Sequence, residues 1–360
     1  MTPDQKTALT MREQGKSRAE IAASMGKSET AVKGLLSRAR AWAEADPAAQ
    51  QAANAAGSNA LPHSFWVKTE NHSVYYKAPA QEVAQADWWV DAFADIPAFK
   101  HEPIEIEANN LLSVYPIFDL HHGMLSWGEE TNGQDYDVQI ASADLRKSIA
   151  RLDALTPKGG ESLLILGGDT LHINDQTNAT PASRHQLDAD GRYYKVLDTA
   201  IKSISWLIEH LAYRHDKVKV RVLRGNHDIE SHIALSFALA ERYRDTPRIT
   251  IEKSPMDLFM HRHGVCLIAA HHGDKSPPQR LAMYLADVCS YYSDTRHRHI
   301  LTGHIHHDSA KDFPGVKWQS LRAFCPADAY GAGFGPRRAL RCMVFDDKKG
   351  LVLTAEDGVE

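Results

Sequence analysis

Short apolar runs, each ending in a cluster of polar residues, recur along the chain from about residue 109. Runs of this length, rich in β-branched and aliphatic side chains, are typical of buried strands. Helical patterns lie between several of them, for example at 141–155 and 193–214. Strands that alternate with helices predict an α/β domain. The apolar runs are LLSVYPIFDL, SLLILGGD, KVKVRVLRGNH, GVCLIAAHHG and HRHILTGH.

Three later apolar runs follow one another without long helices between them, at 316–324, 338–346 and 350–356. Strands joined by short connections are typical of antiparallel pairing. These runs therefore predict a second, more antiparallel sheet near the C-terminus.

Residues 1–45 have a different pattern, in which capping signals separate short helices. Ser17 and Glu20 form a capping-box pattern ahead of the apolar segment IAASMG. Gly26 then makes a turn, and Ser28 can cap the next helix. Helix, short turn and helix in this order predict a helix-turn-helix.

The last helix of this segment has one apolar and one basic face. Its buried face is predicted to consist of Val32, Leu35 and Leu36. The segment resembles small helix-turn-helix DNA-binding modules, which implies that its basic residues contact DNA phosphates. These residues are Lys33, Arg38 and Arg40. Self-association through a helical bundle is the alternative.

The composition and charge of the chain limit the class of protein to which it can belong. The chain has 360 residues, of which 43% are hydrophobic and 24% charged, so it can form a large core. A net charge of -5 provides no general attraction to nucleic acid, so any basic surface must be local. No CxxC pair, secretory leader or bilayer-spanning run is evident, which predicts a cytoplasmic protein that does not enter a membrane. The oligomeric state stays open.

Residues 46–108 separate the helical segment from the α/β domain at 109–360. They begin with the low-complexity stretch DPAAQQAANAAGSNA, which is typical of a linker. Trp88, Trp89 and Phe93 follow, and we expect them to pack on the next domain as an aromatic clasp. We therefore predict a helix-turn-helix-like module, a linker with a clasp, and an α/β domain.

The polar clusters at the ends of the apolar runs contain carboxylates, imidazoles and one amide. Any one of them is weak evidence, but five in order are hard to explain as structural coincidence. Carboxylate and imidazole together suit divalent Mn, Fe, Zn or Ni, and the lack of a cysteine set argues against a structural zinc site. On a strand, alternate side chains share a face, so Asp119 and His121 can hold one ion, as can His304 and His306.

In order, the clusters are DxH, GD, GNH followed by Asp, HHGD and GHxH, and this set resembles the calcineurin-like metallophosphoesterase family. The blocks span most of residues 119–306. The run DLHHGMLSWGEETNGQDYD also resembles phage- and prophage-type members. The resemblance implies an α/β fold, namely a four-layer metallophosphoesterase sandwich of two mixed β-sheets flanked by helices.

The resemblance further implies two divalent metal ions per chain, with manganese first and zinc, iron or nickel as alternatives. Asp169 would bridge them, and His271 is the alternative to His272 in the doublet. One ion would be held by Asp119, His121, Asp169 and His306. The other would be held by Asp169, Asn226, His272 and His304.

His227 and Asp228 are the predicted catalytic residues beside ligand Asn226. The resemblance implies that His227 faces the substrate and donates a hydrogen bond or proton, while Asp228 orients its imidazole. Two ions can clamp a phosphate and make a bridging hydroxide nucleophilic, so no serine or cysteine nucleophile is needed.

Substrate choice is expected to depend on the segments between the ligand blocks. One of them, 171–186, is polar enough to form a lid. The candidate substrate-binding residues are Trp127, Tyr136, Tyr330 and Arg337. Acidic Glu129 and Glu130 count against a deep nucleic-acid channel.

Three functions remain. The first is a phosphodiesterase or nuclease that acts on nucleic acid, with DNA as a partner through the N-terminal segment. The second is a phosphatase or esterase for nucleotides, cyclic nucleotides or phosphomonoesters. The third is an inactive DNA-binding regulator, against which the intact ligand set counts.

Overall fold

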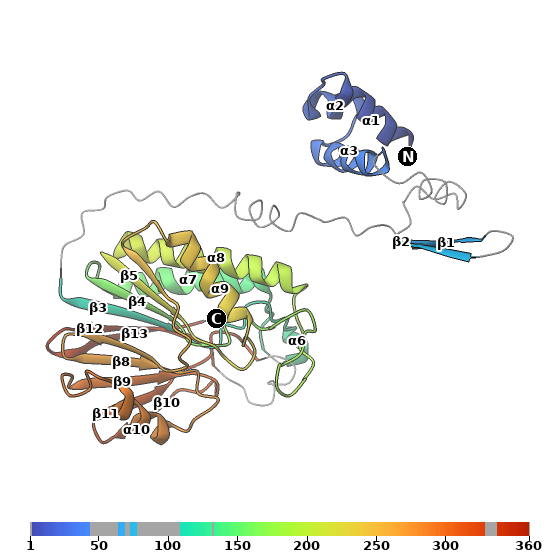
Figure 1. The fold of residues 1–360 in the computed structure, drawn as a ribbon. Helices are drawn as coiled ribbons and strands as arrows, with labels where there is room; N and C mark the ends of the chain where they lie inside the picture. Colours follow the sequence, from blue (N-terminus) through green and yellow to red (C-terminus); the bar gives the residue numbers. More distant parts are fainter. Residues whose placement is uncertain are drawn as a thin grey trace. The chain divides into compact units, whose positions relative to one another are not determined.

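The computed structural model describes residues 2–43, 64–68, 73–77, 109–131, 133–327 and 337–359. The chain forms two compact units, Met1–Ile96 and Pro97–Glu360 (Figure 1). The predicted linker and the aromatic clasp residues Trp88, Trp89 and Phe93 lie outside the described residues. Within 46–108, the described part is a hairpin of β1 (Ser64–Lys68) and antiparallel β2 (Ser73–Lys77).

The first unit begins with the helices α1 (Pro3–Glu13), α2 (Arg18–Met25) and α3 (Glu29–Ala43). The predicted capping box is present, because the Ser17 side chain accepts from the Glu20 N–H and the Glu20 side chain accepts from the Ser17 N–H. Gly26 ends α2 in a left-handed conformation at φ 61°, which glycine adopts without strain. The predicted helix-turn-helix is therefore confirmed.

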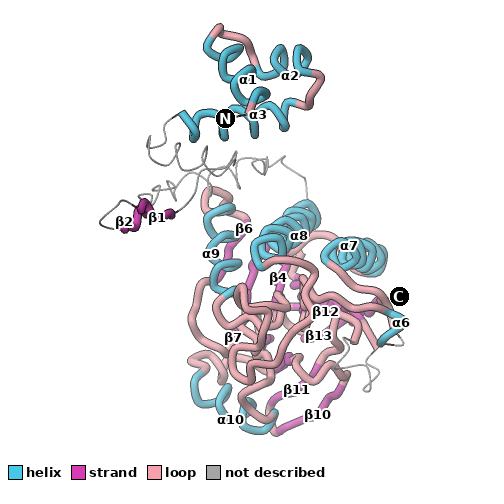
Figure 2. Tube along the Cα trace, turned by 90° about the vertical axis from the view of Figure 1, so that its right-hand side faces the viewer, coloured by secondary structure: helices cyan, strands magenta, loops and turns pink. Residues whose placement is uncertain are grey.

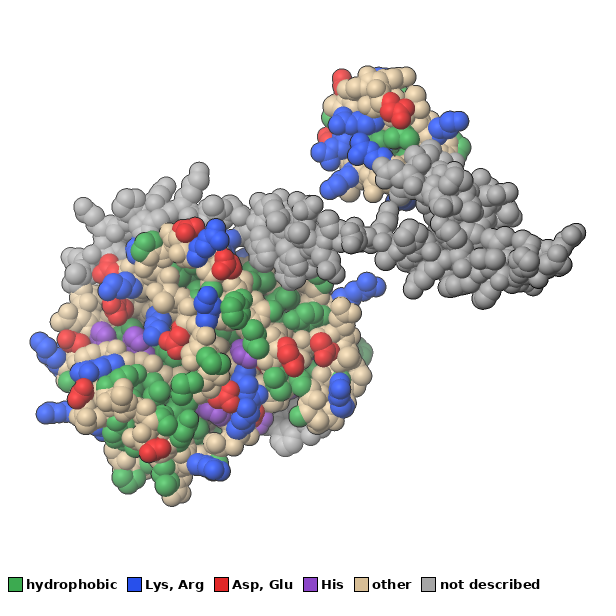
Figure 3. All heavy atoms as spheres, in the orientation of Figure 1, with side chains coloured by type: hydrophobic (Ala, Val, Ile, Leu, Met, Phe, Trp, Pro, Cys, Tyr) green, Lys and Arg blue, Asp and Glu red, His purple; other side chains and the backbone are tan. Residues whose placement is uncertain are grey.

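An apolar cluster holds these three helices together. Ala8, Ile21 and Val32 have no exposed surface, and Leu36 is also buried, as its position in the pattern predicts. Leu35 is only partly buried at the edge of the cluster. Lys33, Arg38 and Arg40 are exposed on α3. Figure 3 shows Lys and Arg side chains gathered close together on these helices.

The second unit contains a six-stranded sheet in the order β13-β12-β3-β4-β5-β6. Strands β3 to β6 are mutually parallel, while β12 is antiparallel to both β3 and β13. The strands are β3 (Leu111–Ile117), β4 (Glu161–Leu166), β5 (Lys217–Val222), β6 (Ile249–Glu252), β12 (Ala339–Asp346) and β13 (Gly350–Gly358).

A five-stranded sheet has the order β10-β11-β9-β8-β7. Its central strands β8, β9 and β11 are parallel, and its edge strands are antiparallel to them. The strands are β7 (Phe259–His263), β8 (Cys266–Ala270), β9 (His297–Thr302), β10 (Ser309–Phe313) and β11 (Val316–Ser320).

The two sheets pack face to face with helices outside them (Figures 1 and 2). A buried apolar cluster, which includes Val114, Ile165, Ile268 and Phe345, joins the facing sides of both sheets. Helices α7 (Val138–Leu155), α8 (Tyr193–Arg214) and α9 (Ser231–Tyr243) contact the six-stranded sheet, and α10 (Pro278–Val288) contacts β11. The α/β class with two mixed sheets flanked by helices is therefore confirmed.

The placement of the last strands differs from the sequence prediction. β11 joins the five-stranded sheet parallel to β9, whereas β12 and β13 return to the other sheet beside β3. A second sheet is present, but the expectation that the last three strands share it and make it more antiparallel is wrong. Apolar alternation predicts that these segments are strands, but it does not specify which sheet edge each one joins.

None of the helices among the described residues is long and apolar enough to cross a membrane.

Candidate metal centre

The polar clusters meet because of how the parallel strands are aligned. In the six-stranded sheet Ile117 pairs with Leu166, which in turn pairs with Val222, so β3, β4 and β5 end at one level. Asp119, Asp169 and the Asn226 block follow these ends, and His272 and His304 follow β8 and β9 of the facing sheet. Loops at the carboxyl ends of parallel strands share one edge, which is where ligands bind in such folds.

The backbone at the candidate ligands is not that of a strand. Both β3 and β9 have ended before the DxH and GHxH residues begin. The residues with left-handed φ angles are Asp119 (51°), His121 (43°), Asp169 (48°), His304 (68°) and His306 (57°). The expectation that strand alternation aligns each pair is therefore wrong. Left-handed backbone costs about 1–2 kcal/mol for a residue with a side chain, and such strain is concentrated at functional sites.

Hydrogen bonds between the loops hold this strained backbone. The His121 N–H donates to the Asp169 carbonyl at 2.8 Å, and the His304 N–H donates to Asp119 Oδ2 at 2.9 Å. The His227 N–H donates to Asp169 Oδ1 at 2.8 Å. Asp119 and Asp169 therefore each have one carboxylate oxygen bound to a backbone amide, which leaves the second oxygen for another partner.

Two glycines allow this close approach of loops. A Cβ at Gly225 would lie 1.9 Å from Asp169 Oδ1, and one at Gly303 would lie 2.4 Å from Asp119 Oδ2. No side chain fits at such distances, which explains why glycine precedes Asn226 and His304 in the polar clusters.

Three groups of potential ligand atoms share this edge, and the atoms of each group lie within 4.8 Å of one another. The first two match the predicted ligand sets: Asp119, His121 and His306 form the first, and Asp169, His272 and His304 form the second. The third consists of His121, His172 and His227 and shares His121 with the first. The oxygen Asp169 Oδ2 lies between the first two sets, 3.8 Å from His121 Nε2 and 3.3 Å from His272 Nε2. Asn226 joins the second set, since its Oδ1 is 3.0 Å from His272 Nε2. The structure thus brings all seven sequence-predicted ligand residues together.

The donor set fits divalent cations. Asp119 Oδ1 and His121 Nε2 are buried and have no hydrogen-bond partner among the described residues. Buried polar atoms without partners are rare, and bound ions are one of their explanations. The arrangement of oxygen and imidazole donors suits manganese, iron, zinc or nickel.

The pKa values of the histidines in the site depend on burial and on the nearby carboxylates. Burial alone lowers the pKa of His272, but Asp169 and then Asp119 more than compensate and raise it to about 10. Burial and the neighbouring His227 instead keep the pKa of His121 well below 6.5. His121 is therefore a neutral imidazole, the form that binds a metal, while the carboxylates around His272 attract positive charge.

His272 rather than His271 belongs to this set. His272 Nδ1 lies 3.1 Å from the Gly167 carbonyl oxygen, which leaves Nε2 directed toward Asp169 and Asn226. The Nδ1 atom of His271 instead accepts from the Gly273 N–H at 2.9 Å. His122, next to ligand candidate His121, lies 3.1 Å from the Thr199 hydroxyl through its Nε2.

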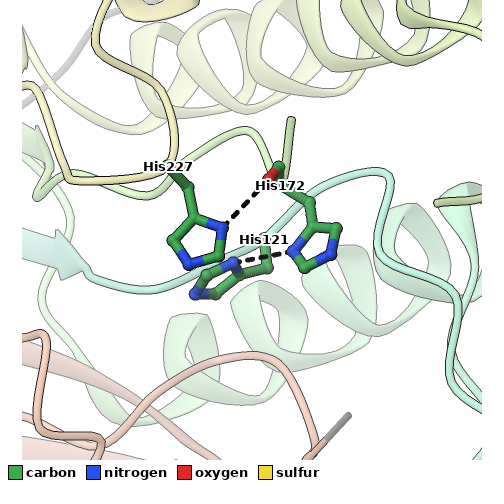
Figure 4. Close-up of side chains that lie close together, drawn as sticks. All are labelled: His121, His172 and His227. Atoms are coloured by element: carbon green, nitrogen blue, oxygen red, sulfur yellow. Dashed lines mark hydrogen bonds between the residues drawn. The ribbon is translucent and has the colours of Figure 1, made fainter. Parts of the chain in front are cut away.

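His227 lies beside the ligands, and a residue that the sequence prediction missed adjoins it. His227 Nδ1 is 3.1 Å from the backbone oxygen of His172, and the His172 ring is 3.1 Å from His121 through their Nδ1 atoms (Figure 4). Burial lowers the pKa of His172 to about 3, so its ring is neutral. Its position three residues after Asp169 is the signal in the sequence that could have identified it, although the segment 171–186 also has the polar composition of a lid.

The contacts of Asp228 differ from those that the predicted orienting role requires. Its carboxylate is fully buried and accepts from three backbone amides: Gly225 at 2.6 Å, Thr170 at 2.8 Å and Leu171 at 3.3 Å. The His227 ring instead contacts His172 and His121. Asp228 therefore ties the Asp169 loop to the Asn226 loop, and the His172 carbonyl is the group that contacts His227 Nδ1.

The candidate substrate residues have different surroundings. Tyr136 is buried, and its hydroxyl donates to the Leu120 carbonyl at 2.8 Å, so it belongs to the core rather than to a substrate surface. Trp127 is 60% exposed just before the short helix α6 (Gly128–Thr131). Arg337 is exposed, and Tyr330 lies outside the described residues.

Comparison with known proteins begins with the N-terminal helices. Residues 1–42 match the family model described as sigma-70, region 4. This match agrees with the helix-turn-helix that the capping pattern predicts and concerns only that part of the chain. No curated protein matches the sequence.

Solved structures similar to this chain include a predicted phosphoesterase, an archaeal phosphodiesterase and Vps29. A predicted phosphoesterase from Streptococcus pneumoniae is 10% identical with a TM-score of 0.31, and the match covers 70% of this chain and 99% of that chain. An archaeal phosphodiesterase is 13% identical with a TM-score of 0.36, covering 68% and 99% of the chains. Vps29 from Entamoeba histolytica, complexed with zinc, is 13% identical with a TM-score of 0.28, covering 69% and 99%. Similarity at this level carries no information about substrate or reaction.

Proposed function

We propose that the protein is a metal-dependent phosphodiesterase that hydrolyses phosphodiester bonds of nucleic acid at a dinuclear centre. The observation that carries this proposal is the pair of donor sets on either side of Asp169 Oδ2, with Asp119 Oδ1 and His121 Nε2 buried and without hydrogen-bond partners among the described residues. Two divalent ions bound there supply Lewis acidity toward a phosphate and make water nucleophilic near neutral pH.

The seven candidate ligands divide into two groups that share Asp169. The first ion would be held by Asp119, His121, Asp169 and His306. The second would be held by Asp169, Asn226, His272 and His304. Manganese is our first candidate for both positions, and zinc, iron and nickel share the same donor preference.

His227 supplies the proton chemistry in this proposal. Its Nδ1 must carry a hydrogen to donate to the His172 carbonyl, so Nε2 is the nitrogen that can exchange a proton with the substrate. The ring lies beside His121, with the two ring centroids 4.7 Å apart, and in this proposal it faces the substrate and does not bind a metal ion. His227 can therefore protonate a leaving oxygen or stabilise charge on the phosphoryl group.

The nucleic-acid part of the proposal rests on the first unit. A helix-turn-helix positions one helix on a duplex, and basic side chains on that helix contact phosphates. Lys33, Arg38 and Arg40 are exposed on α3, and the match to sigma-70 region 4 covers this helix up to residue 42. A tethered DNA-binding module raises the concentration of DNA at an active site on the same chain.

The alternative is a nucleotide, cyclic-nucleotide or phosphomonoester substrate. Glu129 and Glu130 are exposed on α6, and acidic side chains there would repel the backbone of a long polyanion.

One experiment decides between these substrates. The protein is loaded separately with Mn, Zn, Fe or Ni and assayed on a bis-phosphodiester reporter, a phosphomonoester, cyclic nucleotides, and single- and double-stranded DNA and RNA. We expect cleavage of the diester reporter and of DNA. Turnover of the monoester alone would reject a diesterase, and no turnover with any metal would reject the enzyme.

A further inference from the structure

We propose that a cavity next to the candidate metal centre binds the nucleoside portion of the substrate. The inference rests on the proposed phosphodiesterase function and specifies which part of the substrate lies beside the phosphate. The cavity has a volume of about 290 Å³. Its lining includes Gly273, Ser276, Leu281, Gly303, Ile305 and Trp318.

Residues that line the cavity are neighbours in sequence of the candidate metal ligands. Gly273 directly follows His272, and Gly303 directly precedes His304. Ile305 lies between His304 and His306, and its side chain is 48% exposed. A phosphate held by these histidines would therefore have one of its ester groups within reach of the cavity.

The inner wall of the cavity is apolar. Leu281 on α10 and Trp318 on β11 are both nearly buried. The Trp318 Nε1 donates to the Thr302 hydroxyl at 3.1 Å, so the polar atom of the indole already has a partner and its ring remains as apolar surface. Figure 3 shows apolar side chains gathered over the region where Figure 1 places α10.

The charged side chains of the lining, Asp274 and Lys275, are paired with Arg224 and Asp257 outside it. Arg224 forms an ion pair with Asp274, and its Nε is 3.5 Å from Asp257 Oδ1. The Lys275 ammonium is 2.8 Å from Asp257 Oδ2. Two cations and two carboxylates leave no net positive charge to attract a second phosphate. The cavity therefore suits an uncharged group joined to the phosphate that the metal centre holds.

The lining also has a polar side chain. Ser276 is half-buried and lines the cavity, and its hydroxyl can donate to or accept from a nucleobase or a sugar hydroxyl, whereas a purely aliphatic group provides no such partner. Apolar walls with a few polar groups are typical of small-molecule sites.

The volume limits the size of the occupant. Small-molecule sites typically measure about 300–1,000 Å³, so this cavity is at the lower limit and fits a single nucleoside rather than several nucleotides. The cavity thus selects for a nucleoside at one side of the cleaved phosphate.

The test fills the cavity with Ser276→Trp, because Ser276 lines it and precedes Pro277 at the start of α10. Met283→Trp is the matched control, since Met283 lies on the same helix, is 68% exposed and does not line the cavity. Binding of thymidine to the metal-free full chain is measured by saturation-transfer NMR, and equal melting temperatures verify that each variant folds.

The metal-loaded chains are then assayed on two diesters with the same leaving group, thymidine 5′-p-nitrophenyl phosphate and methyl p-nitrophenyl phosphate. We expect Ser276→Trp to weaken thymidine binding and raise KM for the thymidine ester about tenfold, because one pocket contact typically contributes about 10–200-fold in discrimination. The methyl ester should be unaffected, and Met283→Trp should change neither substrate.

Unchanged thymidine binding in Ser276→Trp, or equal losses on both esters, would overturn the nucleoside assignment. Absence of turnover in the unmodified chain would instead reject the proposed function, and thymidine binding would still decide whether the cavity holds a nucleoside.

Discussion

The Nδ1 atom of His227 lies 3.1 Å from the backbone oxygen of His172, and the two imidazole rings stack with their centroids 5.3 Å apart. The contact is made by a carbonyl, so it depends on where the Asp169 loop runs rather than on the side chain at position 172. The loop that carries the shared carboxylate therefore also sets the orientation of the candidate proton donor.

His227→Ala should keep both metal ions and lose turnover by about a hundred- to ten-thousand-fold, the usual contribution of a general acid or base. The measurement is metal content together with kcat on the diester reporter. His172→Ala is the comparison variant, because it retains the backbone carbonyl that contacts His227 and should cost far less in kcat, while the lost ring contact with His121 is checked through metal content. Loss of metal from the His227 variant would show that the residue is a ligand.

Asp169→Ala should remove both ions, whereas His306→Ala should mainly weaken one. The reason is that Asp169 Oδ2 faces both donor sets, while His306 Nε2 lies 3.6 Å from Asp119 in only one of them. Elemental analysis after manganese or zinc loading gives the stoichiometry. A single ion in the unmodified chain would contradict the dinuclear centre.

A chain that begins at Pro62 should bind metal and cleave the diester reporter as well as the full chain. It should lose affinity for DNA, because the phosphate contacts of α3 are removed. Each lost contact should flatten the slope of log affinity against log salt concentration by about one unit. Lys33→Ala, Arg38→Ala and Arg40→Ala test the contacts singly. Equal DNA cleavage by both chains across a salt series would reject the targeting role and favour the small-substrate alternative.

Stability should fall in mild acid because of His215, which is fully buried between the Tyr115 hydroxyl at 3.3 Å and the Gly159 carbonyl at 2.9 Å. Burial lowers its pKa to about 4, so the folded state disfavours its protonated form. The stabilisation is complete above the unfolded pKa of about 6.5 and is lost as pH falls toward 4, a change of about 3 kcal/mol.

Urea denaturation at pH 7 and pH 4.5 measures this effect. His215→Gln cannot be protonated and should show a smaller difference between the two pH values. The same pH dependence in both proteins would mean that other groups cause the acid sensitivity.

Asp228→Asn should lower the free energy of unfolding by about 1–3 kcal/mol, the cost of leaving buried partners unsatisfied. The asparagine amide would present N–H groups to the backbone amides that now donate to the carboxylate. Denaturation of the metal-free chain measures this loss directly. An unchanged stability with reduced turnover would instead favour the orienting role that we first predicted.

Much of the fold could be predicted because each element depends on local signals. The Ser17 and Glu20 capping box and the apolar runs before Asp169 and Asn226 marked helices and strands at the observed places. The sheet that each C-terminal strand joins could not be predicted, because β12 pairs with β3 more than 200 positions earlier in the chain.

The candidate site was predictable in composition but not in conformation. The spacing in DxH was explained by strand alternation, yet Asp119 and His121 follow the strand in left-handed backbone that no periodicity encodes. The contact of His227 with His172, where the sequence predicted Asp228, could not be foreseen for a similar reason. Which of them contacts His227 depends on how two loops pack, and that information is absent from either segment alone.

The candidate ligands come from both sheets, Asp119 and Asp169 from one and His272 and His304 from the other. A bound ion would therefore be a reversible cross-link across the central core. Ions at a hundred times their dissociation constant add about 2.7 kcal/mol to the cost of any opening that breaks the site. The metal supply around the protein would then determine how often the two halves of the sandwich separate and expose their apolar faces to water.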